Sequence, residues 1–63
     1  MYIAKLFSTA STPVSVISMN VKSILDAKRY AISASDDFNV PGFDAIHTIL
    51  LYVDGTKIDT ITL

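Results

Sequence analysis

His47 is the only histidine in the chain and the first residue to consider as a catalytic group. It follows Asp44 by three residues, in a run typical of a strand, and no serine, cysteine or second histidine forms a recognisable arrangement with it. A general base works only with a nucleophile or substrate within hydrogen-bond reach. We therefore expect no catalytic residue and no enzyme activity. His47 should be structural or solvent-facing, with a contact to a partner as the alternative.

The acidic loop comes nearest to a metal site. Asp37, Asn39 and Gly42 fall at positions one, three and six of a calcium-loop template, but Pro41 stands at position five and Thr48 replaces the bidentate glutamate at position twelve. The two glycines of the chain both fall in turns, which leaves none for a phosphate-binding loop. Without cysteine, disulfides and thiolate metal sites are excluded. We expect no metal and no cofactor.

Length and composition bound the remaining possibilities. A chain of 63 residues is a single domain, residues 1–63, too small for a spacious active-site cleft, and its 51% hydrophobic residues are enough to fold it. The net charge of −1 lacks the long-range field of a nucleic-acid or anionic-membrane binder. We therefore expect a protein partner, with nucleic acid as the weaker possibility.

No segment is expected to enter a membrane. The longest stretch without a charge, residues 6–21, has 16 residues, contains Pro13 and six serines or threonines, and is too short and too hydroxylated to span a bilayer. A secretory signal would need a continuous apolar block, which the Ser/Thr cluster before Pro13 interrupts. We expect a cytoplasmic protein.

Two strands are predicted in the first third of the chain. Tyr2–Phe7 mixes β-branched and aromatic residues with a two-residue alternation and stops at a Ser/Thr/Pro cluster. Val14–Met19 follows Pro13, which cannot donate a ladder hydrogen bond and so belongs at the start or edge of a strand.

A hairpin is predicted at the end of the chain. Ala45–Val53 and Thr56–Thr62 flank Asp54-Gly55, and Asp-Gly between two β-rich runs indicates a type I′ turn with positive φ at both residues. Before it, Ser35–Asp44 is a tethered loop in which Phe38 and Phe43 should fold back onto the core.

One helix is predicted between the two strand pairs. Asn20 is a good N-cap, and the helix should run from Val21 to about Ser35. At 100° per residue one broad arc is apolar and should pack on the sheet: Val21, Ile24, Leu25, Ala27, Ala31, Ile32 and Ala34. Lys28 lies inside this arc, and we expect its stem to be buried with the ammonium extending past the sheet edge, or else paired with a carboxylate.

These elements define an α+β fold in the order β-β-α-β-β, a four-stranded antiparallel sheet with one helix packed on one face. A regular hairpin pairs Val53 with Thr56, Leu51 with Ile58 and Ile49 with Thr60 beneath the helix. The opposite face would then be uncovered and keep five apolar residues of the hairpin: Ile46, Leu50, Tyr52, Ile61 and Leu63. Because apolar patches of this kind mark interaction surfaces, we expect a homodimer or larger assembly formed by stacking of these faces, with pairing through an edge strand as the alternative.

One helical segment resembles a known group. The run Ile24–Ser33 contains an Ala-Lys-Arg-x-Ala core at residues 27–31, followed by a loop with aromatic residues and a final hairpin. Over about the last 40 residues this is similar to very small phage-encoded host-takeover proteins such as type I-F anti-CRISPR proteins. The resemblance implies a phage product that binds a host protein complex and blocks it without catalysis.

The sequence thus favours a non-enzymatic protein–protein interaction module and, through the resemblance, a phage-type inhibitor of a host protein complex. The residues expected to bind the partner are the helix cations and the uncovered apolar groups: Lys22, Lys28, Arg29, Ile46, Leu50, Tyr52 and Ile61. The alternative is a small nucleic-acid-binding module, with the sheet aromatics Tyr2, Phe7 and Tyr52 for stacking and the helix cations for phosphates.

Overall fold

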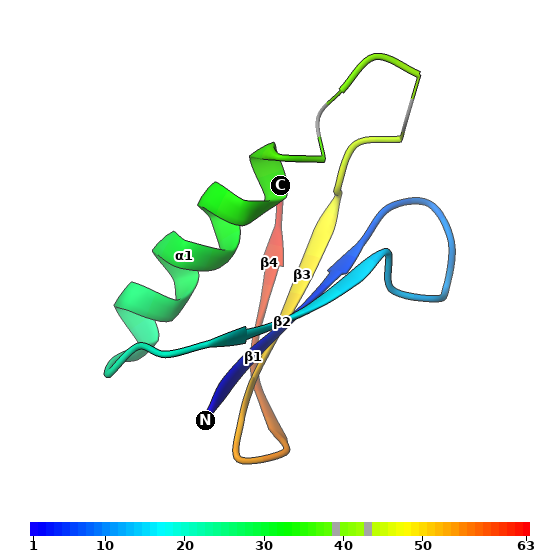
Figure 1. Ribbon diagram of the computed structural model, residues 1–63. Coiled ribbons are helices and arrows are strands. Elements are labelled where there is room, and N and C mark those ends of the chain that lie inside the picture. The colour runs from blue at the N-terminus through cyan, green and yellow to red at the C-terminus, as the bar shows by residue number, and fades with distance from the viewer. Residues whose placement is uncertain (39, 43) are drawn as a thin grey trace.

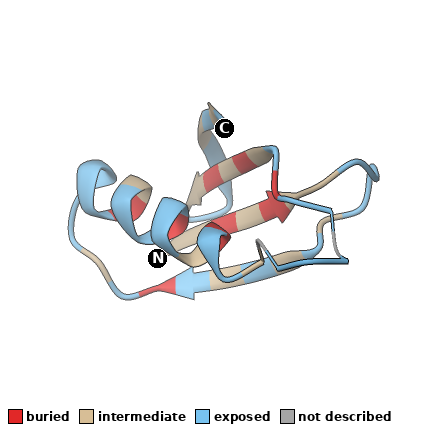
Figure 2. Cartoon of the chain, turned by 90° about the horizontal axis from the view of Figure 1, so that it is seen from above, coloured by how far each residue is buried: buried red, intermediate tan, exposed pale blue. Residues whose placement is uncertain are grey.

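The computed structural model describes residues 1–38, 40–42 and 44–63. Its elements follow the order β1 (Tyr2–Phe7), β2 (Ser15–Met19), α1 (Ile24–Asp36), β3 (Thr48–Val53) and β4 (Thr56–Thr62) (Figure 1). The sheet has the strand order β2-β1-β3-β4, and every neighbouring pair is antiparallel. Helix α1 packs on one face, against β1, β2 and β3 (Figure 2). The predicted α+β fold is confirmed.

The helix begins later than predicted. Ser23, not Asn20, is the N-cap: its backbone is extended, and its Oγ accepts a hydrogen bond of 3.2 Å from the Asp26 N–H. The physical reason is the route of the chain, because Met19 is buried at the end of β2 and residues 20–23 carry the chain up to the helix layer. With 13 residues, α1 is too short to cross a bilayer, and no helix in the described ranges is long and apolar enough to do so.

The helix packs on a narrow stripe of small residues. Ala27 and Ala31 have no exposed surface, and Ser35 continues the stripe with its hydroxyl donating to the Ile32 carbonyl. The broad apolar arc predicted from the sequence is wrong at three large residues, which are exposed: Ile24 at the first position of the helix, and Leu25 and Ile32 at one margin of the arc. The alanines bring the helix axis close to the sheet, so only the positions that face the sheet directly become buried.

The core lies between this stripe and the covered face of the sheet. Its fully buried sheet residues are Ala4, Leu6, Ile49 and Leu51. Phe38 packs against the core as predicted, whereas Phe43 lies outside the described residues. Ile46 is also buried in the core, in the segment before β3, which begins at Thr48 rather than Ala45.

The Asp54-Gly55 turn has the predicted conformation. Its φ angles are 49° and 84°, so both residues are in the left-handed region that a type I′ turn requires. The amino terminus of Met1 forms an ion pair of 2.6 Å with the Asp54 carboxylate, which links the start of β1 to the turn.

The hairpin register departs from the prediction after its second pair. Val53 faces Thr56 as expected, and Tyr52 faces Lys57, as the same regular register requires. Leu51 faces Asp59, however, which leaves Ile58 as the extra residue of a β-bulge. Every later residue of β4 is therefore turned to the other face, and Ile61 pairs with Ile49 on the helix side. The predicted pairs of Leu51 with Ile58 and Ile49 with Thr60 are wrong.

Candidate interaction surface

The face of the sheet turned away from α1 is uncovered, and we call it the open face. Because side chains alternate along a strand, its composition follows from the buried positions Ala4, Leu6, Ile49 and Leu51, whose neighbours point the other way. Its central strands contribute six half-buried residues: Ile3, Lys5, Phe7, Thr48, Leu50 and Tyr52. The outer strands add Val16, Ser18, Lys57, Thr60 and Thr62.

An aromatic residue of this face, Tyr52, lies between two lysines near the turn that joins β3 to β4. The Lys5 Nζ atom lies 4.7 Å from the centroid of the Tyr52 ring, within the range of a cation–π contact. On the other side of Tyr52, Lys57 is its direct cross-strand partner in β4 and is exposed. Two lysines on different strands therefore flank Tyr52, and the ammonium group of Lys5 lies over its ring.

The carboxylates lie elsewhere. Among the described residues, none of the strand positions on the open face is acidic. Asp26 and Asp36 belong to α1, Asp44 accepts a hydrogen bond of 3.2 Å from the Thr9 hydroxyl in the loops, and Asp54 is paired with the amino terminus. Although the net charge of the chain is −1, the open face carries lysines and apolar residues and is basic.

Another aspartate, Asp59 of β4, is held on the helix side. Lys28 Nζ lies 2.6 Å from Asp59 Oδ2, and the Thr60 N–H donates to Asp59 Oδ1 at 2.8 Å. The Lys28 hydrogen bond, followed by that of the Thr60 backbone, lowers the pKa of the Asp59 carboxyl. Our expectation that the Lys28 ammonium extends past the sheet edge is wrong, since the carboxylate alternative is the arrangement found.

The predicted partner-binding residues do not form one surface. Leu50 and Tyr52 lie on the open face as expected, but the placement of Ile46 and Ile61 there is wrong, because Ile46 is buried and Ile61 packs against the core. Lys28 is held by Asp59. The remaining two, Lys22 before α1 and Arg29 within it, are exposed on the helix side.

Sequence reasoning missed most of the open face. The residues it did not propose for protein binding are Lys5, Phe7, Val16 and Lys57. The two-residue period of a strand fixes which residues of Tyr2–Phe7 share a face, but which face meets the helix follows only from the burial of Ala4 and Leu6. The predicted homodimer relied on Ile46 and Ile61 as contacts, and neither residue lies on the open face. The structure contains one chain, so the homodimer stays a prediction.

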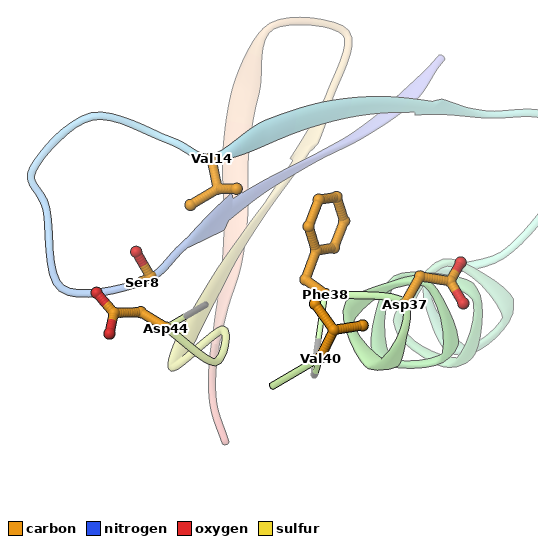
Figure 3. A pocket seen from close by; sticks show the side chains of 6 residues that line it. All are labelled: Ser8, Val14, Asp37, Phe38, Val40 and Asp44. Atoms are coloured by element: carbon orange, nitrogen blue, oxygen red, sulfur yellow. The ribbon is translucent and has the colours of Figure 1, made fainter. Parts of the chain in front are cut away.

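A pocket of about 380 Å³ lies between the end of α1 and the loop between β1 and β2. Figure 3 shows Phe38 in its middle, with the carboxylates of Asp37 and Asp44 at opposite ends. These two carboxylates do not form a pair that could share a proton or a metal ion. Among the described residues there is no cluster of three or more potential metal ligands.

His47 is exposed and contributes its backbone to the fold. Its N–H donates to the Phe7 carbonyl at 2.8 Å, and its carbonyl accepts from the Leu63 N–H at 2.9 Å.

The sequence matches no model of a known protein family, and no curated protein sequence or solved structure is significantly similar to it.

Proposed function

We propose that this chain is a non-enzymatic interaction protein that binds a partner protein stoichiometrically through the open face of its sheet. The observation that carries the proposal is the composition of that face. Ile3, Phe7 and Leu50 lie on central strands and keep part of their surface in water, although the chain has buried other apolar groups beneath the helix. Covering such groups on association is favourable by about 25 cal/mol per Å².

The form of the surface favours a macromolecule over a small molecule. Small-molecule sites are concave and bury most of their ligand, whereas the open face spans four neighbouring strands.

The similarity of the Ile24–Ser33 run to phage-encoded inhibitors supports a more specific proposal, in which the partner is a bacterial host complex met in the cytoplasm and blocked by binding.

Affinity purification of the tagged chain from a bacterial lysate tests this function when it is combined with two surface variants. Val16→Asp places a charge on the open face at a residue that is 56% exposed in an edge strand. Leu25→Asp is the matched control on the helix, at a residue that is 57% exposed. Circular dichroism should show that both variants fold, because neither side chain belongs to the core.

We expect one multisubunit complex to co-purify in stoichiometric amount with the wild-type chain and with Leu25→Asp, and to be lost with Val16→Asp. Loss with Leu25→Asp but not with Val16→Asp would place the binding surface on the helix and contradict the proposal. The proposal also fails if the wild-type chain retains only background protein.

A further inference from the structure

We infer that the open face takes an acidic partner, a protein segment or surface whose carboxylates pair with Lys5 and Lys57 on either side of Tyr52. This inference rests on the proposed function, since it assumes that the open face is where a protein binds. It specifies the chemistry of that protein: carboxylates spaced to meet two lysines, with apolar groups between them to cover Leu50 and Ile3.

The first argument is the cost of burying an unpaired cation. Lys5 occupies a central strand, is half-buried and holds its ammonium over the Tyr52 ring, so any partner that covers Tyr52 also covers Lys5. Removing an ammonium group from water without a counter-charge is expensive. The described residues of the open face supply no carboxylate, so the counter-charge has to come from the partner.

The same argument disfavours a second copy of this chain as the occupant. Stacking two open faces would bring Lys5 and Lys57 of each copy into one interface that contains no carboxylate from either. Asp59 is paired with Lys28 on the helix side and Asp54 with the amino terminus, and the other four aspartates lie on the helix, at its end or in a loop. Like charges without counter-charges oppose association.

Single-stranded nucleic acid is the other anionic candidate, and two observations speak against it. Lys5 lies over the Tyr52 ring and occupies a face on which a base would stack. Two lysines on the face could neutralise about two phosphates, a small electrostatic contribution beside that of a protein that makes about 6–10 such contacts. A carboxylate needs only the ammonium groups and leaves the ring contact intact.

Peptide titration of the isotopically labelled full chain, followed by amide chemical shifts, tests the inference. The probes are an extended peptide of about six residues that alternates Glu with Val, the same peptide with Lys in place of Glu, and an oligo-thymidine single strand. We expect the Glu peptide to shift amides around Lys5, Tyr52 and Lys57 and to bind more weakly as salt rises, and the Lys peptide to leave them unchanged.

Two variants make the result specific. In the chain with both Lys5→Met and Lys57→Met, which keeps the apolar stems, affinity for the Glu peptide should fall by about tenfold or more. Lys22→Met is the matched control, since Lys22 is exposed and lies off the open face, and its affinity should stay within about twofold of wild type. An unchanged far-ultraviolet spectrum shows that each variant is folded.

Other outcomes overturn the inference. Equal binding of the Glu and Lys peptides would indicate an apolar partner surface without carboxylates. Tighter binding of the oligonucleotide would indicate a nucleic acid. Amide shifts of the free chain that depend on its own concentration would indicate a second copy as the occupant. If the double variant still retains the complex that Val16→Asp loses, the acidic partner is wrong while the interaction function stands. If no complex is captured and no probe binds, both proposals fail.

Discussion

Lys28 of α1 and Asp59 of β4 form an ion pair of 2.6 Å that joins the helix to a strand outside its packing surface. The helix rests on β1, β2 and β3, and the Lys28 side chain extends beyond them to the outer strand β4. The pair exists because the bulge at Ile58 turns Asp59 to the helix side. A regular hairpin would place Asp59 on the open face instead.

The Lys28–Asp59 pair predicts a pH-dependent contribution to stability. Because the folded state lowers the pKa of Asp59, the contribution is fully present above the ordinary pKa of an aspartate and is lost as the pH falls through the lowered value. In urea unfolding, the advantage of the wild-type chain over Asp59→Asn should therefore shrink as the pH falls from about 5 to about 2.

Two controls accompany this measurement. Asp36→Asn changes an exposed helix carboxylate that forms no ion pair among the described residues, so it reports the general effect of removing one negative charge. Asp59→Asn combined with Lys28→Met should destabilise less than the sum of the two single changes, and the difference should decrease with added salt. Strict additivity would mean that the pair contributes nothing.

The bulge predicts unequal effects on stability for substitutions at two neighbouring residues of β4. Ile61→Ala should lower the free energy of unfolding by about 1–2 kcal/mol, less than a fully buried isoleucine because Ile61 is half-buried against the core. Thr60→Ala, on the open face, should change it by less than about 0.5 kcal/mol. Chemical denaturation of both variants checks this, and the reverse order would indicate a hairpin without the bulge.

The N-cap assignment predicts that Ser23→Ala is costly and Asn20→Ala is not. Ser23 Oγ accepts the Asp26 N–H, and loss of such a cap costs about 0.5–2 kcal/mol. Asn20 is exposed and lies outside the helix, so its replacement should have little effect. Thermal unfolding followed by circular dichroism compares the two variants. A larger loss of stability with Asn20→Ala would indicate that the helix begins at Val21.

The turn predicts a backbone penalty at Gly55. Its φ is +84°, and a methyl group there would meet no atom within 4 Å, so Gly55→Ala loses stability only through left-handed strain, about 1–2 kcal/mol. Gly55→Asn should lose less, because asparagine adopts this conformation more readily. The midpoints of thermal unfolding should fall in the order wild type, Asn, Ala. Equal midpoints for all three chains would contradict a left-handed requirement at this position.

The amino-acid sequence alone determined the elements and their order. Strands Tyr2–Phe7 and Thr56–Thr62 are found with the predicted limits, and Asp54-Gly55 makes the predicted turn, because alternation, proline and the Asp-Gly pair act within a few residues of chain. The β-β-α-β-β fold follows, since one helix and two strand pairs have few ways to cover apolar surface.

Tertiary structure decided the faces and the limits that depend on packing. The bulge at Ile58 moved Ile61 to the core and Asp59 to Lys28, and a single inserted residue of this kind leaves no local signature in an alternating strand. The composition of the open face changed with it, because a shift of one residue exchanges the two sides of a strand. Lys5 and Lys57 flank Tyr52 only once β1, β3 and β4 are paired, and pairing between distant segments is a property of the folded chain.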